Sequence, residues 1–86
     1  MTGPDPDHHE SGTPVNLLFN TTHAVLTAEE IILAGGIWCD VVPRPAGTSD
    51  FLCGLAIEIR LSDLETTSSR LKEAGLVFEI FSAEPF

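Results

Sequence analysis

The stretch PRPAGTSDFLCGLAIEIR, residues 43–60, constrains the fold of this chain most strongly. Its two prolines, Pro43 and Pro45, cannot continue a hydrogen-bonded ladder and restrict the residues before them to extended conformations. They therefore end one strand and stiffen the entry to a polar loop. Gly54 lets another backbone or a ligand approach the start of the following strand closely. The stretch thus predicts one thiol, that of Cys53, at the mouth of a shaped loop between two strands.

Alternation of apolar and polar residues predicts four strands. The strand after the loop runs from Cys53 to Arg60, and its alternation is typical of a sheet that is covered on one face only. Cys39 lies in the middle of another strand among apolar neighbours, and we interpret it as a packing residue because cysteine is among the most often buried residue types. The other three strands are predicted at residues 15–20, 37–42 and 77–81.

Two stretches with helical periodicity connect these strands. The first follows the N-cap candidates Thr21 and Thr22 and stops at the glycine pair that begins with Gly35. The second begins with a capping box at residues 62–65, SDLE, in which the serine caps the helix and the glutamate reaches back. Gly75 ends this second helix.

The element order βαββαβ predicts an α+β, ferredoxin-like fold, with a four-stranded antiparallel sheet and two helices on one face. We assign residues 14–82 to this single domain, residues 1–13 to a disordered tail and residues 83–86 to a short C-terminal tail. The strand at residues 37–42 would lie at an edge of the sheet, which favours a homodimer through that edge. Leu33 and Trp38, if exposed, are expected to be buried by the second chain.

Charge and composition exclude several classes of function. Asp and Glu number 13 and Lys and Arg only 4, for a net charge of -9, and such a surface repels nucleic-acid phosphates and anionic lipid. No apolar run approaches the ~20 residues that span a bilayer, and the N-terminus lacks the basic and apolar regions of a signal peptide. Two cysteines are too few for a disulfide scaffold. We therefore expect a cytoplasmic protein that binds neither nucleic acid nor membrane.

A set of short motifs carries a family resemblance. They mark a helix entry, the interior of that helix, the end of one strand and the start of the next, at Thr22, His23, Glu29, Pro43, Pro45, Cys53 and Gly54. In this order and spacing they resemble the selenium/sulfur carrier protein-like family over residues 15–81. Members commonly place an arginine just after the Pro-x-Pro, where this chain has Ala46.

This resemblance implies that Cys53 carries sulfur or selenium as a persulfide or selenosulfide, with no metal and no organic cofactor. The partners would be sulfur or selenium donor and acceptor proteins, and the chain would be a carrier or binding protein rather than a stand-alone enzyme. Pro43, Arg44, Pro45 and Gly54 would support the loop around the thiol.

The residues leave alternatives open. A carrier needs a reachable thiolate, whereas Cys53 shares parity with Leu55 and could face the core instead. We expect Cys53 near the C-terminal ends of both helices, whose negative dipole ends disfavour an anionic sulfur. His23 would stand at the opposite end of the sheet, so we expect no Cys53–His23 pair. The alternative function is a ferredoxin-like binding or regulatory module that uses residues 43–52 to hold a small molecule or a partner chain.

Overall fold

The computed structural model describes residues 13–49 and 52–82, and their elements follow the predicted order βαββαβ. The tails predicted at residues 1–13 and 83–86 lie outside the described residues, Thr13 excepted. The elements are β1 (Pro14–Leu18), α1 (Thr22–Ala34), β2 (Asp40–Pro43), β3 (Leu55–Arg60), the 3-10 turn η2 (Leu61–Asp63), α2 (Leu64–Glu73) and β4 (Glu79–Phe81).

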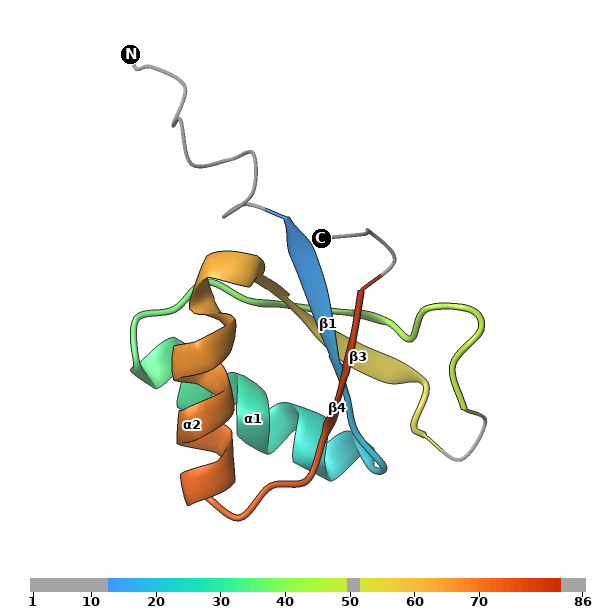
Figure 1. The fold of residues 1–86 in the computed structure, drawn as a ribbon. Helices are drawn as coiled ribbons and strands as arrows, with labels where there is room; N and C mark the ends of the chain where they lie inside the picture. Colours follow the sequence, from blue (N-terminus) through green and yellow to red (C-terminus); the bar gives the residue numbers. More distant parts are fainter. Residues whose placement is uncertain (1–12, 50–51, 83–86) are drawn as a thin grey trace.

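The four strands form one antiparallel sheet in the order β2-β3-β1-β4, with both helices on the same face (Figure 1). This is the ferredoxin-like arrangement that the sequence predicts. The strand that follows the loop, β3, is central, and β2 lies at an edge as expected. None of the helices in the described ranges is long and apolar enough to cross a membrane.

Helix α1 begins and ends at the residues that the sequence indicates. Thr21 is the N-cap, and its Oγ1 accepts a hydrogen bond of 3.0 Å from the Ala24 N–H. After the helix, Gly36 takes a φ of 77°, and the Ile37 N–H donates back to the Ile32 carbonyl at 3.2 Å. A left-handed residue followed by such a bond is the usual glycine stop, because glycine has no Cβ to strain.

Helix α2 ends as predicted but does not begin with the predicted capping box. Gly75 has a φ of 82°, and the next residue, Leu76, donates its N–H to the Leu71 carbonyl at 3.0 Å. At the start, Ser62 lies inside η2, and the cap position falls on Asp63, whose side chain makes no capping bond. The prediction of a capping box is wrong because the chain enters α2 through a 3-10 turn. This turn places Ser62 one residue before the N-cap position.

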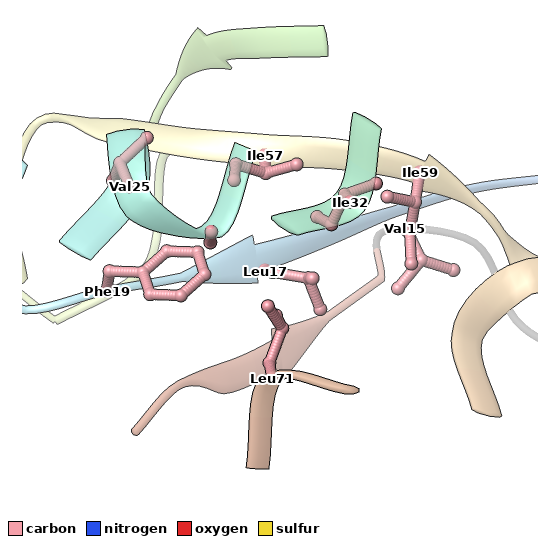
Figure 2. Close-up of a cluster of buried hydrophobic side chains, with 9 residues drawn as sticks. Val15, Leu17, Phe19, Val25, Ile32, Ile57, Ile59 and Leu71 are labelled. Atoms are coloured by element: carbon pink, nitrogen blue, oxygen red, sulfur yellow. The ribbon is translucent and has the colours of Figure 1, made fainter. Parts of the chain in front are cut away.

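The main core lies between the sheet and the two helices (Figure 2). Each central strand directs alternate side chains into it, as period-two alternation requires, and each helix adds its inner face. The fully buried members are Val15, Leu17, Phe19, Val25, Ala28, Ile32, Ile57, Ile59 and Leu71.

The face of the sheet opposite the helices is partly covered as well. Leu18 and Ala56 point to this face, and both are buried. Leu52, from the loop before β3, packs on them and is itself 7% exposed. The prediction of a sheet covered on one face only is therefore wrong at this end, because the loop folds back over the strands and adds a second, smaller cluster.

Strand β2 begins three residues later than predicted, at Asp40 instead of Ile37. The Ile37 N–H is already used in the cap of α1, so the chain is still leaving the helix at this point. Trp38 nevertheless lies under the Arg60 guanidinium, whose carbon is 4.8 Å from the ring centroid. This cation–π contact continues the β2–β3 pairing through side chains where the backbone pairing has not yet begun.

Replacing Thr67 by valine is expected to stabilise the domain by about 1 kcal/mol. Thr67 is fully buried on the inner face of α2, and its Oγ1 has no hydrogen-bond partner among the described residues. Valine keeps the shape and removes the buried hydroxyl, whose desolvation is uncompensated. Urea unfolding of Thr67→Val and of the exposed neighbour Thr66→Val checks this, because only the first should gain stability. A loss of stability in Thr67→Val would mean that the hydroxyl has a partner.

Candidate functional site

Cys53 lies immediately before β3, at the end of the sheet. Its backbone N–H donates a hydrogen bond of 2.9 Å to the Phe19 carbonyl, which ties it to the end of β1. Its Sγ donates to the Leu55 carbonyl at 3.3 Å. The side chain is half-buried and packs against the main core, as its parity with Leu55 predicts. The thiol is thus held at the boundary between core and solvent.

Arg44 holds the backbone on both sides of Cys53. Its own N–H donates to the Gly54 carbonyl at 2.9 Å, and its Nη1 donates to the Leu52 carbonyl at 2.7 Å. The second bond is charge-assisted, and such bonds are shorter and stronger than those between neutral groups. Arg44 is therefore the predicted support residue with the most direct influence on where the thiol lies.

The other predicted support residues lie around this clamp. Pro43 is the last residue of β2 and pairs with Leu55, and the Pro45 carbonyl accepts a hydrogen bond of 2.8 Å from Thr48 Oγ1. At Gly54, apart from its chain neighbours, no described atom lies within 4 Å of the position that a Cβ would take. No other described residue therefore occupies the space that the absent Cβ of Gly54 leaves, and the approach of a ligand there stays a prediction.

Cys53 lies beside the start of α1, and not near its C-terminal end as expected. Its bonding partner Phe19 lies between β1 and α1. At its other end, α1 packs against α2, where a Cβ on Gly35 would meet the Arg70 guanidinium at 3.3 Å. The expectation is wrong for α1 because antiparallel pairing brings the start of β3 to the end of β1, where α1 begins. Helix α2, in contrast, leads into β4, whose first residue pairs with Leu18, so α2 ends at the same end of the sheet as Cys53. The start of α1 favours an anionic sulfur and the end of α2 disfavours it, so the two helix dipoles do not both oppose a thiolate here.

His23 belongs to the first turn of α1, so the expectation that it lies at the opposite end of the sheet from Cys53 is also wrong. Its side chain is exposed. Within the described ranges, however, no hydrogen bond joins His23 to the Cys53 thiol, which donates its hydrogen bond to the Leu55 carbonyl. No group of three or more His, Cys, Asp or Glu side chains that could hold a metal ion occurs in this part of the chain.

Cys39 has a different environment. It precedes β2 instead of lying in mid-strand, and it is half-buried against the main core. Burial raises the pKa of the Cys39 thiol above its ordinary value, and the carboxylates of Glu29 and Asp40 raise this pKa further. The protonated and less nucleophilic form is therefore favoured at Cys39.

Removing the carboxylate of Glu29 is expected to lower the pKa of Cys39 and so to speed its alkylation at a fixed, mildly alkaline pH. The sign follows from the charge, because a neighbouring anion disfavours the thiolate and a neutral amide does not. Iodoacetamide rates of Glu29→Gln in a Cys53→Ser background would measure this. Glu30→Gln is the matched control, since Glu30 is the next residue on α1 and is not among the causes of the shift. Equal rates in both variants would contradict the prediction.

Sequence reasoning missed two contributors to the site. One is Leu52, which anchors the loop on the second face of the sheet and directly precedes the thiol. Its signal was an apolar residue at the end of an otherwise polar loop. The other is the Leu55 carbonyl, which accepts the thiol hydrogen bond, and no side-chain pattern could have revealed it.

The comparisons with known proteins fit this geometry. The chain matches the family described as putative Se/S carrier protein-like over residues 16–82, a range that includes both cysteines and the whole loop between β2 and β3. No curated protein and no solved structure matches it. With most of its length covered by the match, the chain belongs to the Se/S carrier protein-like family.

Proposed function

We propose that this protein carries sulfur or selenium on Cys53. The observation that carries the proposal is the family match over residues 16–82. The structure supports Cys53 over Cys39 as the carrier, because Cys53 adjoins a loop whose ends are clamped by Arg44. Cys39 instead lies near two carboxylates that raise the pKa of its thiol.

The proposed loading step is a sulfur transfer without net oxidation. The Cys53 thiol loses its proton, and its sulfur attacks the terminal sulfur of a donor persulfide. A new S–S bond forms on Cys53 while the S–S bond of the donor breaks, and the donor leaves as a thiolate that takes up a proton. Unloading is the same exchange with an acceptor thiolate, which attacks the sulfur held on Cys53. A terminal selenium would pass by the same route and give a selenosulfide.

The hydrogen bond from the Cys53 thiol to the Leu55 carbonyl has to break when the thiol becomes a nucleophile. In the described state the Sγ–H donates to a carbonyl oxygen. After deprotonation the sulfur has no hydrogen to offer that oxygen, and two acceptors in contact repel each other. The sulfur therefore turns away from Leu55 when it becomes reactive. Because Cys53 is only half-buried, this turn needs a side-chain rotation and no unfolding of the core.

Such a carrier works between a donor and an acceptor protein and is not itself a stand-alone enzyme. A reducing compartment such as the cytoplasm would keep both cysteines free between transfers. The loop between β2 and β3 would be the part that both partners approach, since it adjoins the thiol.

Incubating the protein with inorganic polysulfide and measuring its intact mass tests the proposal. We expect the mass of one sulfur atom to be added, and peptide mapping after alkylation should place it on Cys53. Sulfur on both cysteines equally, or on neither, would contradict the carrier role and favour the binding-module alternative.

A further inference from the structure

The two edges of the sheet differ in how well they are protected against pairing with another strand. The β2 edge carries Pro43 and is followed by Pro45, and proline offers no N–H to a neighbouring strand. The β4 edge, Glu79–Phe81, has no proline or lysine. It instead exposes apolar side chains, with Ile80 at 53% and Val77, just before the strand, at 77%. Glu79 is the one charged residue of this strand, and no described strand pairs with its outer side. An unpaired strand edge is a template for another strand.

The pairing register shows which backbone groups face this edge. Thr13 and Leu61 continue the β1–β3 register, and the Leu61 N–H donates to the Thr13 carbonyl. Hydrogen-bonded pairs alternate along an antiparallel ladder, so Leu17 bonds to β3 and its neighbours on either side bond to β4. Ile80 lies opposite Leu17. Its N–H and C=O therefore point away from β1, towards the side of β4 that no other described strand occupies.

We propose that the β4 edge pairs with β4 of a second copy of this chain, antiparallel and centred on Ile80. In this register Ile80 exchanges both backbone hydrogen bonds with its counterpart, and the two exposed side chains meet on the helix side of the joined sheet. Glu79 lies opposite Phe81 of the second copy, so no two carboxylates face each other directly. The strand is thus complementary to itself.

The structure favours this edge over the strand-two edge and the patch predicted with it. Leu33 lies on α1, in the helix layer, whereas Trp38 stacks on Arg60. Arg60 follows the buried Ile59 and points to the other face of the sheet. One flat contact cannot cover both Leu33 and Trp38. The β4 edge, in contrast, presents the outward backbone groups and the exposed side chain of one residue, Ile80, at the same place.

Sedimentation velocity over a range of concentrations, for wild type, Ile80→Lys and Leu33→Lys, tests the proposal. Ile80 and Leu33 are both 53% exposed, so the two substitutions are matched. We expect wild type and Leu33→Lys to dimerise alike and Ile80→Lys to dimerise at least about tenfold more weakly, since a charge would face its counterpart across the pair. Added salt should strengthen the dimer, because each copy carries a net charge of -9. A basic partner strand would show the opposite salt dependence.

A cross-link tests the register independently of affinity. Paired residues in a hydrogen-bonded position have Cα atoms about 5.5 Å apart, within disulfide range. In a background without Cys39 and Cys53, Ile80→Cys should form a disulfide-linked dimer under mild oxidation, and Leu33→Cys should not. A wild type that stays monomeric at all concentrations and salts, or a dimer lost in Leu33→Lys but kept in Ile80→Lys, would overturn the proposal. None of these measurements depends on sulfur loading.

Discussion

Replacing Cys53 by serine is expected to abolish sulfur loading while the domain stays folded. The serine hydroxyl can donate to the Leu55 carbonyl as the thiol does, and the backbone bond to Phe19 does not involve the side chain. An alcohol is a far weaker nucleophile than a thiol at neutral pH, because it is scarcely ionised. Intact mass after polysulfide treatment should therefore show no added sulfur, and circular dichroism should match wild type.

Cys39→Ser is the control for this result. Its thiol is held in the less reactive form by burial and two carboxylates, so its removal should leave the added mass unchanged. Loading that persists in Cys53→Ser and disappears in Cys39→Ser would reverse the assignment of the carrier residue. Loading that persists in both single variants would show that either thiol can accept sulfur.

Replacing Phe19 by alanine is expected to unfold the domain at room temperature. Phe19 is 1% exposed, and its ring lies 6.1 Å from that of Phe78, centroid to centroid. Truncating a buried phenylalanine to alanine costs about 3–5 kcal/mol. A core in a domain of this size supplies about 3–5 kcal/mol of net stability. The expected loss is therefore as large as the entire free energy of unfolding. Chemical denaturation of Phe19→Ala should show no cooperative transition.

Leu26→Ala on α1 is the matched control, because Leu26 is 50% exposed and its loss should change stability by no more than about 0.5 kcal/mol. Phe19→Leu should keep a cooperative transition at a lower denaturant concentration, since most of the buried volume remains. A normal transition in Phe19→Ala would contradict the central place of this ring in the core.

The fold could be predicted because its signals are local. The glycines that end each helix and the alternation in β3 can be recognised from a few neighbouring residues. The order of the elements is then compatible with only a few topologies. The start of β2 was placed too early because the cap of α1 takes the Ile37 N–H. A pattern of side chains does not show which backbone groups a preceding helix has already used.

The site was less predictable because it depends on contacts distant in sequence. The bond from Cys53 to Phe19 and the packing of Leu52 on Leu18 both join the loop to β1. Neither contact has a periodic signature. The predicted position of the thiol relative to α1 was also wrong. The actual position follows from antiparallel pairing once the register is known.

The hydrogen bonds of Arg44 fix the position of the Cys53 thiol independently of the amino-acid sequence of the loop. Because Arg44 bonds to the carbonyls on both sides of Cys53, it joins the two ends of the loop between β2 and β3. Doubling the length of a flexible loop costs only about 0.6 kcal/mol in closure entropy. Insertions and sequence changes in this segment can therefore accumulate without moving the sulfur. Under the proposed carrier function, such a scaffold could acquire new exchange partners by changes in one loop, while the sulfur of Cys53 keeps its position.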